Sequence, residues 1–338
     1  MTRYILILIL FIGFLVESSD AALVWRPGEG WVNESSGETL AASDAKEALQ
    51  IARNLETKEA WDDAAAAYKS IVRSWPLSSA AGEAQFKAGY MKERMGDFWA
   101  AYKAYQKVVE KYSTNQFFNL AIERQYNIGN LYLAGEPQRL WKIPLLPSME
   151  KTVEIFETVV KNAPYGTYAA PSHFKIGLAR ENQGSYSKAI SSYTQLLDRY
   201  PGSDLADDAQ YQIGYAWFRA SSLPDYDQSA AEKAIEAFQD FLVKYPNSEK
   251  VAQAEEYVGK LTSRKVEGSF NIAKFYEKQK NFKAALIYYR EVVREGPETE
   301  FAELATERID ALDPTARSQD ENNNSDPSPE SVETASTS

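Results

Sequence analysis

The sequence contains no cysteine and only one histidine, His173, among its 338 residues. The absence of cysteine excludes disulfides, zinc–thiolate sites, iron–sulfur clusters and cysteine nucleophiles from this sequence. A single histidine excludes metal sites built from several histidines and leaves little room for Ser-His-Asp catalysis. Glycine and proline, at 17 and 14 residues, are not enriched. The composition therefore indicates a globular, helical chain that has few of the side chains on which catalysis ordinarily depends.

Positive charge is also scarce, because 37 lysines and arginines stand against 48 acidic residues and give a net charge of −11. Proteins that bind nucleic acids need clustered positive charge to contact phosphates, so we expect no nucleic-acid partner. The sequence shows no phosphate-binding glycine loop, no nucleophile elbow and no dinucleotide fingerprint. We therefore predict a protein that is not an enzyme, with no catalytic residues, no bound metal and no cofactor.

The first residues have the pattern of an export signal. A positively charged start, residues 1–3, precedes an apolar run over residues 4–16, and the small residues Ser19 and Ala21 follow it. This pattern predicts a secretory signal peptide over residues 1–21. The alternative is a membrane anchor that stays in place, but the run gives roughly 20 Å of helix against a hydrocarbon core of about 30 Å. We expect the protein to be exported.

Six segments in the middle of the chain share one pattern of side chains. Each has a small residue, an aromatic residue four positions later, an aliphatic pair and, in most segments, a proline that would end a helix. Spacings of three and four residues place these side chains on one face of a helix, where we expect them to form the core. The aromatic positions are Tyr68, Tyr105, Phe156, Tyr193, Phe238 and Tyr289. A second helix is predicted before each of these, so the repeated unit is a helical hairpin.

One of these units resembles the tetratricopeptide repeat closely. Residues 170–203 carry the characteristic glycines, alanine, aromatic residue and proline of that repeat, which are Gly177, Gly184, Ala189, Tyr193 and Pro201. The resemblance implies an all-α fold, a superhelix (α-solenoid) of about six helical hairpins. The predicted units are 45–78, 82–115, 122–166, 170–203, 207–248 and 266–299, and an amphipathic segment over 301–312 is predicted to cap the stack.

The sequence therefore predicts four parts. They are a signal peptide (1–21), a linker segment (22–44), the repeat solenoid (45–312) and a C-terminal tail (313–338). The tail is rich in acidic residues, asparagine, serine and proline, so it cannot bury apolar surface and we expect it to be disordered. The linker contains Trp25 and Trp31, which either pack on the first helix pair or form a docking segment.

Stacked hairpins of this class form a concave groove that binds extended peptides or helices of partner proteins. We predict partner binding by polar and aromatic residues, mostly of the first helices, namely Tyr90, Arg94, Asn127, Asn130, Trp141, Arg180, Tyr215 and Arg219. Trp141 belongs to an insertion over residues 136–148, whose prolines prevent a helix. This insertion either folds back over its own unit or exposes an apolar patch to a partner.

The second half of the sequence resembles the family of BamD, a component of outer-membrane β-barrel assembly. The resemblance covers residues 150–312 and is strongest in the run SFNIAKFYEKQKNFKAALIYYREVVREGPETEFAELA. It implies a non-enzymatic periplasmic scaffold, associated with the outer membrane, that binds other assembly subunits or unfolded barrel proteins.

Two features set the sequence apart from that family. The family typically has five repeat units, whereas six are predicted here and two of them lie ahead of the matching region. Its members normally carry a lipid on a cysteine at the end of the signal peptide, where this sequence has Ser18 to Ala22. We therefore expect membrane association to come through a partner. The alternative function is a periplasmic repeat adaptor for another envelope process, such as cell division or peptidoglycan-linked complexes.

Overall fold

The structure is a computed structural model. It describes residues 23–26, 30–33, 39–40, 42, 44–136, 139–140, 143–144, 148–222 and 229–313, with only the backbone described in the strands before residue 41 and between residues 139 and 144. The predicted signal peptide (1–21) and the tail beyond Asp313 lie outside the described residues. The same holds for Trp141 and for most of the insertion that contains it.

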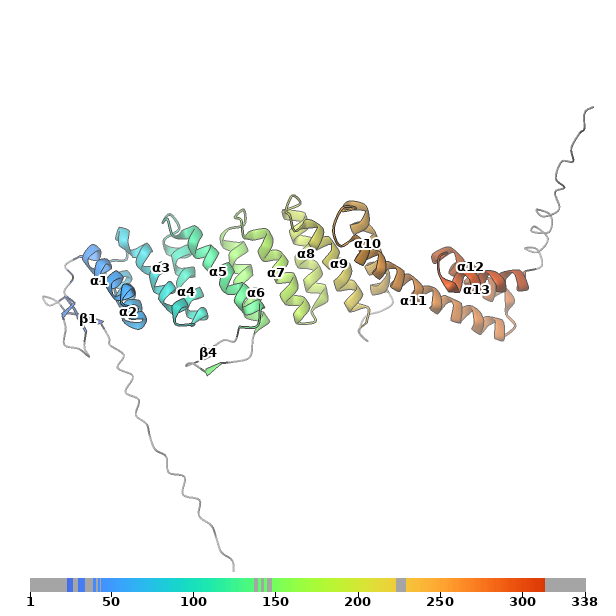
Figure 1. The fold of residues 1–338 in the computed structure, drawn as a ribbon, viewed down its shortest axis with the longest axis horizontal. Helices are drawn as coiled ribbons and strands as arrows, with labels where there is room; N and C mark the ends of the chain where they lie inside the picture. Colours follow the sequence, from blue (N-terminus) through green and yellow to red (C-terminus); the bar gives the residue numbers. More distant parts are fainter. Residues whose placement is uncertain are drawn as a thin grey trace, which may run out of the picture. The chain divides into compact units, whose positions relative to one another are not determined.

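The chain forms two compact units, and the boundary between them falls after Ala179, within a helix. The first unit contains α1 (Ala45–Thr57), α2 (Trp61–Ser74), α3 (Ser79–Arg94), α4 (Phe98–Lys111), α5 (Phe118–Leu133) and α6 (Met149–Asn162). Each of these helices packs against the next one in the sequence, and Figure 1 shows them following one another in pairs. The helix α7 (Ala169–Asn182) contains the boundary.

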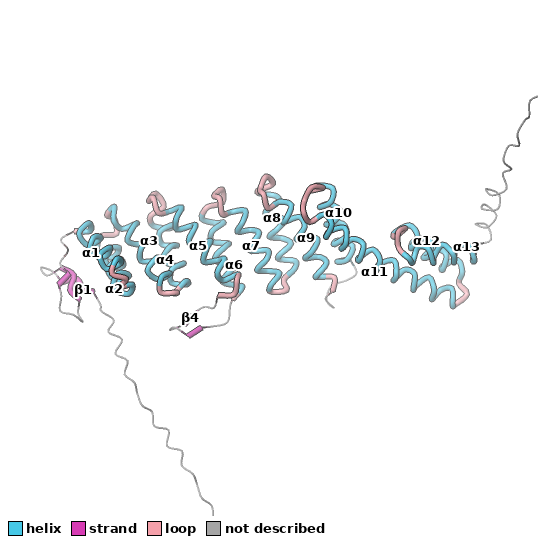
Figure 2. Tube along the Cα trace, viewed as in Figure 1, coloured by secondary structure: helices cyan, strands magenta, loops and turns pink. Residues whose placement is uncertain are grey.

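The second unit continues the same arrangement. It contains α8 (Tyr186–Arg199), α9 (Ala206–Ala220), α10 (Ser229–Lys244), α11 (Val251–Lys278), α12 (Phe282–Glu295) and α13 (Glu300–Leu312). Neighbouring helices from α8 to α13 again pack in sequence order, and α13 contacts both α12 and α11. In Figure 2 the helices account for nearly all of the described chain. The predicted all-α repeat fold is therefore confirmed, with α13 capping the last hairpin.

The hairpins are closed by local signals that the sequence carries. Asp97 and Asn281 accept hydrogen bonds from backbone N–H groups in the first turns of α4 and α12, as N-cap residues do. Two glycines, Gly96 (φ 73°) and Gly184 (φ 69°), adopt the left-handed conformation that ends the preceding helix. These features set the length of the first helix and the direction of the second.

The repeated aromatic residues form the centre of each hairpin. All six have no exposed surface. Each ring lies against a small residue of the preceding helix, and a Cβ added at Gly214 would lie only 2.6 Å from Phe238. Gly129 and Gly89 face Phe156 and Tyr105 in the same manner. Close contact between ring and helix backbone therefore explains why small residues recur at this position.

Short strands occur where the sequence predicted none. β1 (Leu23–Arg26), β2 (Gly30–Asn33) and β3 (Thr39–Leu40) form an antiparallel sheet with β2 in the middle, within the segment predicted as a linker. β1 contacts α2. In the insertion, β4 (Arg139–Leu140) pairs with β5 (Ile143–Pro144). Strands of two to four residues are too short for an alternating pattern to show in the sequence.

Candidate protein-interaction surfaces

Four of the buried tyrosines are hydrogen-bonded to a glutamate twelve residues earlier in the chain. The tyrosine hydroxyl is the donor, and the pairs are Tyr68–Glu56 (2.5 Å), Tyr105–Glu93 (2.7 Å), Tyr193–Glu181 (2.7 Å) and Tyr289–Glu277 (2.7 Å). The glutamate lies near the end of the first helix and the tyrosine lies in the second. Each bond therefore joins the two helices of one hairpin.

Three of these glutamates also bind a basic residue of the element that follows their own hairpin, which is the next hairpin or, for Glu277, the capping helix α13. Lys87 Nζ lies 2.7 Å from Glu56 Oε1, and Arg124 Nη1 lies 3.2 Å from Glu93 Oε1. Arg308 of α13 pairs with Glu277 in the same way. A carboxylate that receives both a hydroxyl and a cation joins consecutive hairpins as well as the two helices of its own.

Two hairpins have longer segments between their helices, residues 134–148 between α5 and α6 and residues 221–228 between α9 and α10, and both lack this polar pair. They have Phe156 and Phe238 in place of tyrosine. At the position of the glutamate, four residues after the small residue, they have Leu133 and Phe218. The hydroxyl and the carboxylate are thus replaced together, so that neither remains buried without its partner.

The pKa values of Glu181 and Glu277 are shifted in opposite directions. Burial raises the pKa of Glu181, and the hydrogen bond from Tyr193 opposes that change. The hydrogen bond from Arg308 lowers the pKa of Glu277. Burial and the bond to Glu277 raise the pKa of Tyr289 to about 12, so this tyrosine keeps its proton at neutral pH.

Cavities lie beside this motif in the first and the last hairpin. One of about 620 Å³ lies between α1 and α3 and is lined by Glu56, Lys87, Trp61 and Tyr90, among others. Another of about 690 Å³ lies between α11 and α13 and is lined by Glu277, Arg308, Phe270 and Phe275, among others. Both combine charged groups with aromatic rings.

The predicted binding residues Tyr90 and Arg94 meet at the first of these cavities. The Arg94 guanidinium lies 5.1 Å from the centre of the Trp61 ring. The Tyr90 ring lies between two cations, with Lys87 Nζ at 5.5 Å and Arg124 Cζ at 5.6 Å from its centre. Tyr90 is half-buried and Arg94 is exposed, so both present surface to the cavity.

Tyr215 and Arg219 also lie together, on α9. Arg219 Nη1 lies 3.4 Å from the Tyr215 hydroxyl, and its guanidinium lies 5.7 Å from the centre of the Tyr186 ring. The Tyr215 ring contacts Tyr257 of α11 at 5.8 Å between ring centres. These contacts hold both side chains against their own unit.

The remaining predicted residues are not brought together. Asn127 is exposed and Asn130 half-buried on α5, whereas Arg180 is half-buried on α7 and donates a hydrogen bond to Gln183 at 3.2 Å. His173 is buried within α7, at 5% exposure.

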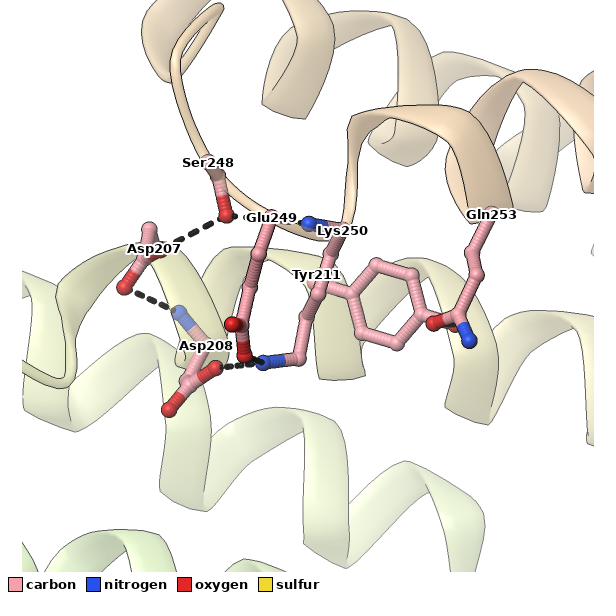
Figure 3. Close-up of polar contacts among 7 residues, drawn as sticks. All are labelled: Asp207, Asp208, Tyr211, Ser248, Glu249, Lys250 and Gln253. Carbon is pink, nitrogen blue, oxygen red and sulfur yellow. Dashed lines mark hydrogen bonds and ion pairs between the residues drawn. The ribbon is translucent and has the colours of Figure 1, made fainter.

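Polar contacts fix the start of α11 on α9. The Ser248 hydroxyl donates a hydrogen bond to Asp207 Oδ2 at 2.7 Å, and Lys250 forms an ion pair with Asp208, as Figure 3 shows. The Tyr211 hydroxyl donates a hydrogen bond to Gln253 Oε1 at 3.3 Å. Figure 3 labels both residues. The adjacent acids Asp207 and Asp208 therefore have a structural role, because each binds a residue that precedes α11.

Among the residues that the structure describes, no group of three or more His, Asp or Glu side chains is placed to hold a metal ion. No helix there is long and apolar enough to span a bilayer.

The consecutive hairpins, with a small residue facing a buried aromatic ring in each, define a tetratricopeptide-repeat protein. A tetratricopeptide-repeat family model matches residues 83–115. The chain belongs to the YfiO family, whose model is described as "Outer membrane lipoprotein" and matches residues 146–322, which is just over half of the sequence. This match begins just before α6 and extends beyond α13.

Solved structures with similar folds include other repeat proteins. The MamA protein is 20% identical, with 62% of this chain and 94% of that chain covered and a TM-score of 0.34. YrrB, described as a TPR protein with an unusual peptide-binding site, is 18% identical. The match covers 63% of this chain and 92% of that chain, with a TM-score of 0.34. A tetratricopeptide repeat protein from Parabacteroides merdae is 14% identical. The match covers 80% of this chain and 99% of that chain, with a TM-score of 0.34. No curated protein matches the sequence.

Proposed function

We propose that this protein is a non-enzymatic scaffold of the cell envelope that takes part in the assembly of outer-membrane β-barrel proteins. The observation that carries the proposal is the YfiO family match over residues 146–322. Repeat proteins of this class bind partner proteins through the surfaces of their stacked helices. The partners we propose are other subunits of the assembly machine or unfolded barrel proteins.

The proposed location is the periplasm, with export directed by the signal peptide predicted over residues 1–21. The family description as an outer membrane lipoprotein supports a position at that membrane. Because the sequence has no cysteine, a thioether-linked lipid cannot be attached to any of its residues. We therefore propose that a partner protein holds the chain at the membrane.

A second function is favoured by the repeats that precede the family match. The hairpins α1–α2 and α3–α4 lie before residue 146, and they carry the cavity lined by Trp61 and Tyr90. This additional surface suits an adaptor for another envelope process, such as cell division or a peptidoglycan-linked complex.

Affinity isolation of the full chain from detergent-solubilised envelopes separates the two functions. We expect the β-barrel subunit of the assembly machine to be recovered in an amount comparable to the chain itself. Recovery of division or peptidoglycan-linked proteins without that subunit would contradict the first function and support the second. Fractionation of the same cells should place the chain with the outer membrane, and extraction by high salt or mild denaturant should release it.

A further inference from the structure

The long helix α11 carries two sets of residues with the same spacing, i, i+4 and i+7. The first set is Ala254, Val258 and Leu261, and the second set, fourteen residues later, is Gly268, Ile272 and Phe275. Ala254 and Val258 of the first set pack in one cluster with residues of α10, and Ala254 and Leu261 are 0% and 2% exposed. The second set is open, because Ile272 is 43% exposed, Phe275 is 58% exposed and Gly268 is also exposed.

In α3 and α9 the matching face of the first helix is covered. The matching residues of α3 are Ala84, Ala88 and Met91, which are all buried in one cluster with residues of α2. In α9, Ala209 and Ala216 are both fully buried, and Ala216 packs with Tyr186 of α8. This face of a first helix therefore receives the second helix of the hairpin before it.

The length of α11 explains why the second set is open. α11 has 28 residues, about twice as many as the first helices α1, α3, α5, α7 and α9. The preceding hairpin packs on its beginning and α12 packs on its end, as Figure 1 shows. Lys265 marks the place where they meet, since its Nζ lies 3.5 Å from Glu232 of α10 and 2.9 Å from Glu295 of α12. Among the described residues, no helix covers Gly268 and Ile272 beyond this point.

A groove of about 470 Å³ runs along this face. Leu261, Gly268 and Ile272 form its floor, and Tyr288 of α12 and Ile235 of α10 line its sides. A Cβ added at Gly268 would have no atom within 4 Å, so the backbone of α11 is accessible there. A helix could approach this floor as closely as α2 approaches Ala84 of α3.

Two charged residues at the edge of the groove are available to a partner. Arg264 and Glu291 both line it, and within the described chain neither forms an ion pair or a side-chain hydrogen bond. A helix that placed an acidic residue near Arg264 and a basic residue near Glu291 would complement both edges.

We propose that this open face of α11, defined by Arg264, Gly268, Ile272 and Phe275, binds an amphipathic helix of a partner protein. The helix occupies the place that the second helix of a preceding hairpin occupies on α3 and α9. It presents apolar side chains to Gly268 and Ile272, and its acidic and basic edges meet Arg264 and Glu291. The proposal rests on the proposed scaffold function for the existence of a protein partner, but not on the envelope process that the scaffold serves.

Site-specific photo-cross-linking in cells that produce the full chain tests this proposal. The photoreactive residue benzoylphenylalanine replaces Ile272, and a matched control replaces Val243, which is 81% exposed at the end of α10. We expect the Ile272 position to cross-link to one defined helical segment of another protein, identified by mass spectrometry of the joined peptides. The yield at Val243 should be at least tenfold lower.

Two glycines of α11 supply a matched pair of blocking variants. Gly268 and Gly259 are both exposed, and an added Cβ at either would have no atom within 4 Å. They are nine residues apart and so lie on opposite faces of the helix. Gly268→Leu should reduce the cross-link at least tenfold, whereas Gly259→Leu should change it less than twofold. Both variants should have the circular dichroism and melting behaviour of a folded chain.

Several outcomes would overturn the proposal. The first is a cross-link from position 272 to a second copy of this chain, to another segment of the same chain or to a non-helical segment. The second is a cross-linking yield at position 272 no higher than the yield at Val243. The third is that Gly268→Leu and Gly259→Leu reduce the cross-link equally. A helix from a protein outside barrel assembly would support this proposal and contradict the proposed assembly function. Recovery of the assembly subunit without any cross-link at position 272 would contradict this proposal and support the proposed assembly function.

Discussion

The hydroxyl of Tyr105 lies 2.7 Å from Glu93 Oε2, and Glu93 is also paired with Arg124 of the next hairpin. Tyr105 is fully buried, so this bond connects the core of one hairpin to the surface between two. The same relationship between tyrosine and glutamate recurs in all four hairpins that have no insertion. It makes the stability of this fold depend on a small number of shared polar contacts.

Tyr105→Phe should therefore destabilise the protein by about 1.5–3 kcal/mol, because a buried hydrogen bond to a charged group is lost. Phe156→Tyr is the reciprocal change, and it would place a hydroxyl in an apolar cluster that includes Leu133. Phe156→Tyr should destabilise the protein by about 1–3 kcal/mol, because the added hydroxyl would be buried without a hydrogen-bond partner. Urea unfolding of both variants measures these values. Unchanged midpoints for both would contradict the role given to the pair.

The two glutamates Glu181 and Glu277 should have opposite effects on the pH dependence of stability. Burial raises the pKa of Glu181 in the folded protein, so its contribution to stability is present below the ordinary glutamate pKa and is lost as the pH rises through the raised value. Arg308 lowers the pKa of Glu277, so its contribution is present above the ordinary value and is lost as the pH falls through the lowered one.

Glutamine substitutions separate these effects, because the amide can still accept the tyrosine hydrogen bond. At pH 7, Glu277→Gln should destabilise the protein by about 1 kcal/mol, since the pair with Arg308 is partly exposed. Glu181→Gln should leave stability at pH 7 unchanged or higher. Melting temperatures measured at several pH values from 3 to 7 test this. A loss at pH 7 as large for Glu181→Gln as for Glu277→Gln would contradict the assigned pKa directions.

Gly214→Ala should destabilise the protein although alanine favours helices more than glycine does. The added Cβ would lie 2.6–2.9 Å from atoms of the buried Phe238 ring, and relieving such crowding typically costs about 1–3 kcal/mol. Gly259→Ala is the matched control, because its Cβ would meet no atom and should raise stability by roughly 0.5–1 kcal/mol. Denaturant unfolding of both proteins measures the difference, and equal shifts in one direction would refute the packing argument.

Ser248→Ala should loosen the start of α11 without unfolding the hairpin that follows it. The change removes the 2.7 Å hydrogen bond to Asp207, whose net contribution is about 1 kcal/mol. Hydrogen exchange should accelerate in the first turns of α11, whereas exchange in α12 should stay as it is. A uniform acceleration over the whole second unit would show that these contacts stabilise more than the local junction.

Much of the fold can be predicted from the sequence, because each hairpin repeats the same local signals. The aromatic residue, the small residue that faces it and the turn glycines such as Gly184 are visible as fixed spacings, and the helices lie where those spacings indicate. The strands near Trp25 and within the insertion are too short to produce such a pattern. The partners of Glu56 and Glu93 come from the next hairpin, and spacing within one repeat does not show them.

The candidate surfaces are less visible in the sequence. Tyr90 and Arg94 were expected on a binding surface and do lie beside one cavity, whereas Asn127, Asn130 and Arg180 form no common site. The open face around Ile272 was not predicted at all. Its signal is the repeated i, i+4, i+7 spacing on α11, but only packing shows that one set is covered and the other is not.

We propose that this chain serves outer-membrane protein assembly, and depletion of the protein in its native cell tests this function. The quantity to measure is the amount of folded β-barrel protein in the outer membrane, detected by its resistance to denaturation by detergent before heating. We predict that folded barrels decrease at least severalfold as the chain is depleted, before division or wall cross-linking changes. Normal levels of folded barrels, together with a defect in cell division or in the cell wall, would contradict the proposed role in outer-membrane protein assembly.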